Sequence, residues 1–353
     1  MDLATSYMGL KLAHPIVASA SSLTATLDGM RRLEDGGAAA VVMASLYEEQ
    51  IRAEDTAYAV LTEEGSFSQS EAGTYFPELP DYDRGMSGHL ETLRRAAESL
   101  DIPVIASLNG TTREGWAEYA AVLEQAGADA LELNIFLVSA DSTSGREVEA
   151  GYLDVVRRVK SSVRIPVSVK LSPFFSSLGH MAGELERAGA DGLVLFNRFF
   201  QRDIDLESLD LKLNVNLSTP EEIYLPMAWL ALLSGQVHLS LAGSRGVDSH
   251  EEIIKYLLAG ADAVMTTSAL LRHGPGHLRT LITGVERWLE ENRFPTVAAI
   301  RGLKNAMHGG NTVELLRADY VKSLTSDVPD RSSAEGPTAT PSPENGSAPR
   351  GRW

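Results

Sequence analysis

The chain has 353 residues, of which 44% are hydrophobic, and it carries a formal net charge of −17. A body with this much negative charge repels nucleic acid and anionic membrane surfaces, so neither is an expected partner. The absence of cysteine excludes disulfides, iron–sulfur clusters on this chain and a cysteine nucleophile. No apolar run is long enough to span a bilayer and no signal-peptide pattern is present, so we expect a cytoplasmic protein.

Two short patterns alternate along the chain. The first is a glycine followed by small residues and an apolar run, and it begins at Gly37, Gly127, Gly189 and Gly260. The second is an Ile-Pro pair followed by an apolar run, and it begins at Ile102 and Ile165. The clearest repeats lie about 60 residues apart, the length of two βα units. The glycines fit helix ends, where a positive φ is favoured, and the apolar runs fit strands buried on both faces.

Counting these units predicts eight strands, each followed by a helix. The strands are expected near residues 15–19, 40–45, 103–108, 129–134, 166–171, 192–196, 237–242 and 262–267. This count favours the α/β class and a closed (β/α)8 TIM barrel, with an open doubly wound sheet as the alternative.

The barrel is expected to span residues 1–324. A short hairpin at residues 7–12 would close its bottom, and residues 46–86 and 197–218 form insertions after the second and sixth strands. Residues 325–353 are rich in Pro, Ser, Gly and Thr and are predicted to form a disordered tail.

The carboxyl ends of the strands are where the active site of such a barrel lies. In this chain they carry small polar side chains and one lysine. In chain order they are Ser19, Ser45, Asn109, Asn134, Lys170, Asn197, Gly243 with Ser244, and Thr267 with Ser268. The three asparagines would offer uncharged donors and acceptors to a planar heterocycle. Taken singly, each asparagine also fits a turn or a helix cap.

Lys170 is the most informative of these residues. Alternation along residues 167–171 places Lys170 and Ser168 on one face of the strand and two valines on the other, so the lysine is expected to point into the barrel mouth. There it would hydrogen-bond an electron-rich cofactor or, as a neutral amine, form a Schiff base with a substrate. The structural alternative is an ion pair with Glu132 on the fourth strand.

The last two strands end in Gly243-Ser244 and Thr267-Ser268, each shortly before a predicted helix. The loops after strands seven and eight form the usual phosphate cradle of this fold. Helix capping by the two serines is the simpler explanation of the same residues. No HExxH motif or other paired spacing of metal ligands occurs, and we predict no metal site.

Several segments resemble the class 1 dihydroorotate dehydrogenases. They are residues 131–134 (LELN), 167–173 (VSVKLSP), 258–264 (LAGADAV) and 270–275 (LLRHGP). The likeness covers roughly residues 5–308. It implies an FMN-dependent enzyme that oxidises dihydroorotate to orotate in pyrimidine biosynthesis, with the cofactor in the barrel mouth.

The resemblance also assigns roles to residues of this chain. Lys170 would hydrogen-bond the flavin ring, stabilise its reduced form and act in catalysis. The implied cofactor-binding residues are Ser19, Ala20, Ser45, Asn109, Asn134, Lys170, Gly243, Ser244, Thr267 and Ser268. The implied substrate-binding residues, for a planar pyrimidine-like molecule, are Asn109, Asn134 and Asn197.

The chain departs from the family at three places. Leu137 stands where the family has a Cys or Ser that removes the substrate proton, and leucine cannot accept a proton. Residues 44–46 (ASL) replace the family's lysine after the second strand, and residues 217–220 (LSTP) replace a glycine pair in the sixth insertion. Ser139 is the expected substitute base, with Asp141 as the alternative.

The leading hypothesis is therefore an FMN-dependent oxidoreductase related to dihydroorotate dehydrogenase. Two alternatives stay open: a flavin-binding barrel with altered or lost dehydrogenase activity, and a Schiff-base lyase that uses Lys170. The sequence does not determine the electron acceptor, the true substrate or the oligomeric state, for which a homodimer is one option.

Overall fold

The computed structural model describes residues 1–51, 85–135, 141–198, 202–213 and 216–305, together with 317, 318 and 320–322. The chain divides into two compact units, Met1–His308 and Gly309–Trp353, and the barrel belongs to the first. Most of residues 306–353 lies outside the described residues, so the expected boundary at residue 324 and the disordered tail stay predictions.

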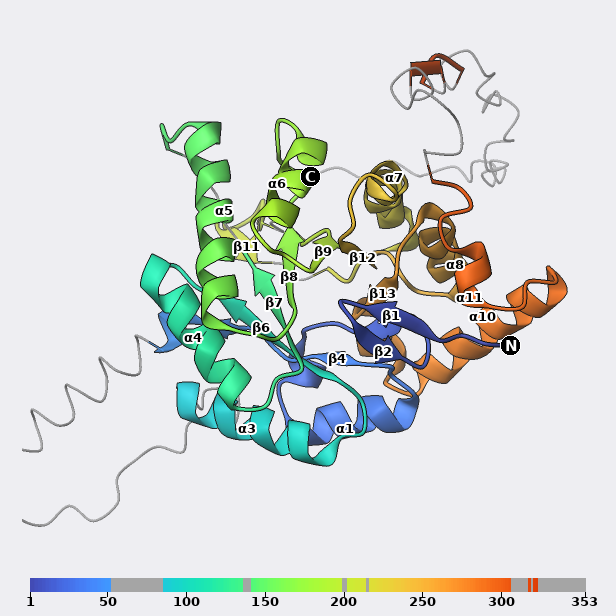
Figure 1. Ribbon diagram of the computed structural model, residues 1–353, viewed down its shortest axis with the longest axis horizontal. Coiled ribbons are helices and arrows are strands. Elements are labelled where there is room, and N and C mark those ends of the chain that lie inside the picture. Colours follow the sequence, from blue (N-terminus) through green and yellow to red (C-terminus); the bar gives the residue numbers. More distant parts are fainter. Residues whose placement is uncertain are drawn as a thin grey trace, which may run out of the picture. The chain divides into compact units, whose positions relative to one another are not determined.

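Eight parallel strands close into a barrel (Figure 1). Going round it, they are β4 (Val41–Val42), β3 (Ile16–Ala18), β13 (Ala263–Thr266), β12 (Ser240–Ser244), β9 (Gly192–Leu195), β8 (Val167–Leu171), β7 (Ala130–Asn134) and β6 (Val104–Asn109). The ring closes because β4 pairs in parallel with β6 as well as with β3. The predicted closed barrel is confirmed, and the open sheet is excluded.

Two strands differ from their predicted ranges by more than one residue at an end. β12 begins at Ser240 rather than at Val237, because Ser240 is the residue that pairs with Gly192 at the start of β9. The second strand is interrupted after β4, and the chain pairs with β6 again at β5 (Leu46–Tyr47). Ser45 therefore lies in the gap between two short segments rather than at the end of a continuous strand.

Helices surround the strands on the outer side of the barrel (Figure 1). They are α1 (Leu27–Gly36), α3 (Gly85–Ser99), α4 (Arg113–Gln125), α5 (Gly145–Ser162), α6 (Leu178–Arg187), α7 (Tyr224–Leu233), α8 (His250–Ala259), α9 (Ser268–His273), α10 (His277–Glu291) and α11 (Val297–Ile300), with 3-10 turns η1 (Ser22–Thr24) and η2 (Pro220–Ile223). Gly37 and Gly260 end α1 and α8 with φ angles of 103° and 116°, which glycine adopts readily. In the part of the chain that is described, no helix has the length and apolar character needed to cross a membrane.

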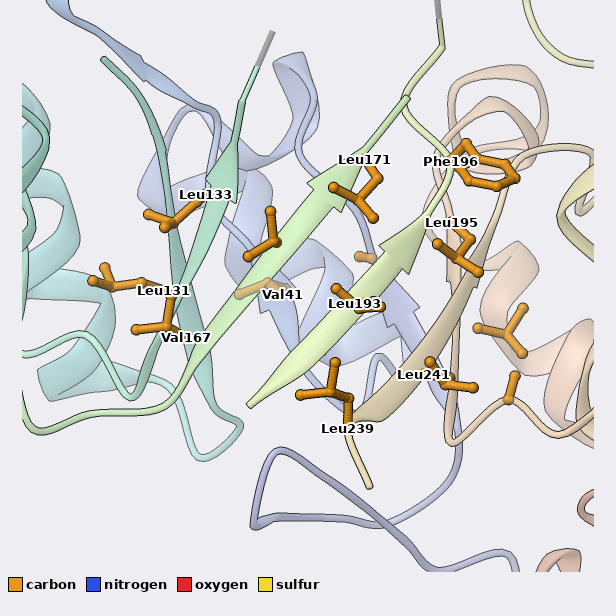
Figure 2. Close-up of a cluster of buried hydrophobic side chains, with 14 of the residues drawn as sticks. Val41, Leu131, Leu133, Val167, Leu171, Leu193, Leu195, Phe196, Leu239 and Leu241 are labelled. Atoms are coloured by element: carbon orange, nitrogen blue, oxygen red, sulfur yellow. The ribbon is translucent and has the colours of Figure 1, made fainter. Parts of the chain in front are cut away.

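The strands bury side chains on both faces. Outward-facing residues of β7, β8 and β9, such as Leu131, Val167 and Leu193, gather in one cluster with residues of the helices (Figure 2). The inward-facing residues form a second cluster of mostly small side chains, including Val194 and Ala242. This double burial explains why the strands are continuous apolar runs in the sequence.

An N-terminal hairpin closes the bottom of the barrel, as predicted. Its strands are β1 (Thr5–Tyr7) and β2 (Leu10–Leu12), paired antiparallel. Tyr7, Met8 and Leu12 are buried among the inward-facing strand residues. The backbone N–H of Met8 donates to Oγ of Ser240 at 2.9 Å and fixes the hairpin to β12.

The two insertions follow the second and sixth strands, as expected. The first runs from β5 towards α3, and its residues 52–84 lie outside the described residues. The second, after β9, contains an antiparallel hairpin of β10 (Arg202–Ile204) and β11 (Leu211–Leu213).

Candidate functional site

A cavity of about 770 Å³ lies at the carboxyl ends of β3, β8, β12 and β13 and is here called the Lys170 cavity. The residues predicted for the site that line it are Ser19, Ala20, Lys170, Asn197, Ser244, Thr267 and Ser268. Tertiary folding thus brings together residues from five of the eight predicted strand ends.

The other predicted residues lie elsewhere. Asn134 reaches the cavity only through Asn197, whose Nδ2 donates to Oδ1 of Asn134 at 2.6 Å. Asn109 is buried at the end of β6 and is not among the residues that line the cavity. Ser45 lines a neighbouring cavity, and its Oγ lies 2.8 Å from Oγ of Ser107. Ser139 falls outside the described residues.

The Cα hydrogen of Gly243 that a side chain would replace faces away from the cavity. A Cβ atom at this position would lie 2.7 Å from the ring of Tyr256 on α8, on the outer face of β12. The glycine therefore permits close packing of the helix on the strand. Only its backbone is available to a ligand at the strand end.

Lys170 has both of the environments that the sequence allowed. Its strand neighbours Val169 and Leu171 pack in the outer core, and its own side chain points inward, where it is 8% exposed and lines the cavity. Its Nζ lies 3.2 Å from Oε1 of Glu132 on β7, which is fully buried. The ammonium group has three N–H donors, so the pair with one carboxylate oxygen leaves donors for a ligand.

The Glu132 carboxylate also bears on the chemistry of Lys170. Its second oxygen, Oε2, is buried and has no hydrogen-bond partner in the structure. This oxygen is therefore an unused acceptor beside Nζ of Lys170.

Tyr7 of the N-terminal hairpin lies on the barrel-bottom side of the Lys170–Glu132 pair. Burial, and next the negative charge of Glu132, raise the pKa of Tyr7 far above its ordinary value. The phenol therefore stays neutral at every physiological pH. The ion pair thus lies between the buried residues of the hairpin and the cavity.

Two arginines that were not predicted from the sequence also line the Lys170 cavity. Nη2 of Arg198 and Nη2 of Arg245 lie 3.0 and 2.6 Å from the two carboxylate oxygens of Glu222. Burial alone would raise the pKa of Glu222, but the hydrogen bonds it accepts from Arg245 and the Thr219 backbone, together with the two positive charges, lower it below its ordinary value. Two cations share one anion, so one positive charge is left over at the cavity wall.

A serine from the sixth insertion joins the loops after strands seven and eight. Oγ of Ser218 donates to Oγ of Ser268 at 2.9 Å, and the backbone N–H of Ser218 donates to the same atom. The N–H of Gly246 donates to Oγ of Ser218 at 3.3 Å. Ser218 belongs to residues 217–220, which depart from the family pattern. This departure was the only feature of the sequence that pointed to Ser218.

The turn after β12 has an unusual backbone. Arg245 and Gly246 both have positive φ angles, of 85° and 70°. The hydroxyl of Tyr256 donates to the carbonyl oxygens of Ser244 and Arg245, at 3.1 and 2.9 Å, and holds the turn from outside. Nε of Arg245 is buried without a hydrogen-bond partner in the structure, which leaves an unused donor at this wall.

Within the described ranges, no three His, Asp or Glu residues come together in a cluster that could hold a metal ion. The polar groups at the cavity are instead cations, hydroxyls and amides. This donor set suits an anionic or strongly polar organic ligand.

Comparison with known proteins identifies the family. Residues 2–289 match the family model described as "Dihydroorotate dehydrogenase". A protein of Thermoplasma volcanium named "Dihydroorotate dehydrogenase B (NAD(+)), catalytic subunit" is 27% identical over 310 residues, which cover 86% of this chain and 98% of the relative. A protein of the same name from Pyrococcus abyssi is 28% identical over 85% of this chain and 98% of the relative.

A third relative carries a different name. The "Putative dihydroorotate dehydrogenase A (fumarate)" of Aeropyrum pernix is 34% identical over 219 residues, which cover 60% of this chain and 70% of the relative. The family model nevertheless covers most of this chain. The chain therefore belongs to the dihydroorotate dehydrogenase family, a family of flavin-dependent oxidoreductases.

Proposed function

We propose that this protein is an FMN-dependent oxidoreductase that oxidises a planar, amide-bearing small molecule at the mouth of the barrel. The observation that carries the proposal is the ammonium group of Lys170, held by Glu132 at the wall of a cavity that also contains two arginines and several hydroxyls. This set of donors fits a cofactor with an electron-rich ring at one end and a phosphate at the other.

The phosphate end would lie against the loops that follow strands seven and eight. The excess positive charge of Arg198 and Arg245 over Glu222 fits a phosphate, and Arg245 has an unused buried donor. The hydroxyls of Ser244, Thr267 and Ser268 line the same cavity. These residues are the proposed phosphate ligands, together with the backbone of Gly243.

The ring end would lie near Lys170, Ser19 and Ala20. Bound there, FMN supplies the acceptor for a hydride from the substrate. Lys170 would hold a positive charge next to the ring and so favour its electron-rich form. The joined amides of Asn134 and Asn197 would orient a ring that carries N–H and C=O groups.

The proton acceptor for the oxidation is a separate question. Leu137 and Ser139 both fall outside the described residues. Asp141 is exposed, and its Oδ1 accepts the backbone N–H of Thr143 at 3.0 Å. Ser139 stays the proposed base, and its replacement by Ala should lower the rate of flavin reduction more than it lowers flavin affinity.

A reconstitution experiment tests the proposal. The purified full chain is titrated with FMN, and dihydroorotate is then added anaerobically while the visible spectrum is recorded. Loss of the oxidised flavin band supports a dihydroorotate dehydrogenase. A protein that does not bind FMN contradicts the proposal.

Two other outcomes identify the alternatives. Bound flavin that dihydroorotate does not reduce identifies a barrel with altered or lost dehydrogenase activity. A substrate adduct on Lys170 that borohydride traps identifies a lyase.

The relatives are named for NAD(+) and for fumarate, so reoxidation by both compounds should be compared. A cytoplasmic location and a homodimer stay predictions, to be tested by fractionation and size-exclusion chromatography.

A further inference from the structure

A second cavity, of about 930 Å³, adjoins the Lys170 cavity, and Ala20 lines both. It is here called the His89 cavity. It is formed by the segment after β3, the gap between β4 and β5, and the beginning of α3. Its polar side chains are hydroxyls, the amide of Gln50 and the imidazole of His89.

The His89 cavity differs from its neighbour in charge. Among the described residues that line it there is no Lys, Arg, Asp or Glu, whereas the neighbouring cavity contains one lysine and two arginines. The adjacent Glu48 uses its carboxylate to accept hydrogen bonds from Thr111 and Thr112 at the start of α4. A charged ligand would lose hydration on entering this cavity and would find no counter-charge in its described wall.

His89 brings unused hydrogen-bonding capacity to this cavity. Its Nε2 atom is buried and has no hydrogen-bond partner in the structure. Burial lowers the pKa of His89 to about 4, so the ring is neutral near pH 7 and offers one donor and one acceptor. The hydroxyls of Ser45 and Thr92 are already engaged, with Ser107 and with the Gly88 carbonyl. Because an unpaired buried polar atom is unfavourable, a ligand that bonds to the ring would relieve it.

We propose that the His89 cavity is the substrate end of the site and that it selects an uncharged pyrimidine-like ring, held by the His89 imidazole, over one that carries a carboxylate. This inference rests on the proposed function, because it assigns the Lys170 cavity to the cofactor. It deepens that function by naming the substrate class.

Uracil and orotate form a matched pair of probes, because they share the pyrimidine ring and differ by one carboxylate. Their affinities are measured by titration calorimetry on the full chain saturated with FMN. We expect uracil to bind at least about 10-fold more tightly than orotate. Orotate binding that equals or exceeds uracil binding, or no binding of uracil, overturns the inference.

Substitution of His89 separates a binding role from a structural one. His89→Leu should weaken uracil binding at least about 10-fold, while the thermal midpoint stays the same or rises because an unpaired buried nitrogen is removed. His89→Gln keeps an uncharged donor and acceptor and should retain most of the affinity. His180→Leu, at an exposed histidine of α6, is the matched control. Unchanged uracil affinity in His89→Leu would overturn the assignment of this residue.

A second substitution tests the argument from charge. Ala44 lines the cavity and carries no hydrogen-bonding group, so Ala44→Lys introduces a cation without removing a side-chain bond. The preference should then shift towards orotate, because its carboxylate gains a counter-charge. A preference that does not change contradicts the charge-based selection.

The same probes distinguish failure of this inference from failure of the proposed function. Both titrations are repeated without FMN, and the His89 ring resonances, assigned by their loss in His89→Leu, are followed by NMR. If FMN does not bind, the proposed function fails, and the response of His89 to uracil still tests the cavity. If FMN binds and His89 does not respond to uracil, the inference alone fails.

Discussion

The bottom and the mouth of the barrel are filled in different ways, although the same strands form both. At the bottom, Met8 and Leu12 of the hairpin meet small apolar side chains of the strands, and the space is closed. At the mouth, the inward-facing positions carry Glu132 and Lys170, and the space above them is an open cavity. Burial of apolar surface stabilises the bottom, whereas a buried ion pair contributes little net stability. We therefore interpret the charged mouth as a binding site and not as part of the stabilising core.

Removing the lysine should have the largest effect at the mouth. Lys170→Met leaves Glu132 buried and unpaired, which should cost about 3–5 kcal/mol of unfolding free energy. The same change should weaken FMN binding by at least about 100-fold, since a charged donor is lost. Denaturant unfolding and flavin titration measure the two effects.

A double variant shows whether these two effects are separable. Lys170→Met combined with Glu132→Gln removes both charges and should recover most of the stability without recovering FMN affinity. If FMN affinity returned together with stability, the lysine would serve only the fold, and the contrast between bottom and mouth would disappear.

A substitution at the bottom should show the opposite pattern. Leu12→Ala leaves a cavity under the barrel and should lower the free energy of unfolding by about 2–4 kcal/mol. FMN affinity should stay the same, because the hairpin is at the far end of the strands. Lys11→Ala, on an exposed position of the same hairpin, should change stability by less than about 0.5 kcal/mol. A loss of FMN affinity in Leu12→Ala at temperatures where the chain is folded would contradict the division between a stabilising bottom and a ligand-binding mouth.

The arginine wall offers a smaller and more specific test. Arg245→Met should weaken FMN binding by about 10- to 100-fold through the loss of a charged phosphate contact. Affinity for riboflavin, which lacks the phosphate, should not change. Arg164→Met, at an exposed arginine, is the control. An equal loss for both flavins would place the arginine at the ring instead of the phosphate.

The smallest expected effect concerns Glu222. The pKa of Glu222 is lower in the folded chain than its ordinary value of 4.5. The ionised carboxylate therefore stabilises the fold above pH 4.5, and this contribution is lost as the pH falls through the lower pKa of the folded chain. Glu222→Gln should therefore destabilise the protein by about 1 kcal/mol at pH 7. In thermal melts this difference should shrink as the pH falls below 4.5. A difference that is constant with pH would show that the carboxylate charge is not involved.

The sequence predicted the parts of the site that depend on local periodicity. Alternation along β8 was enough to turn Lys170 inward, and an ion pair with Glu132 followed from its place on the neighbouring strand. Gly243 shows the limit of this reasoning. It was assigned to the phosphate loop by its position, but its open side accommodates Tyr256, and no sequence pattern reveals which face of a strand a helix side chain approaches.

The glycine-ended helices and buried apolar runs by themselves determined the number of βα units, the (β/α)8 class and the inward position of Lys170, because period and burial are encoded in neighbouring residues. Only the tertiary structure decided that Arg198 and Arg245 share Glu222, that Ser218 reaches Ser268, and that Ser45 lies with His89 in a second cavity. Those groups are far apart in the chain, and the distances between them are set by the closure of the barrel and the paths of its loops, for which no local pattern exists.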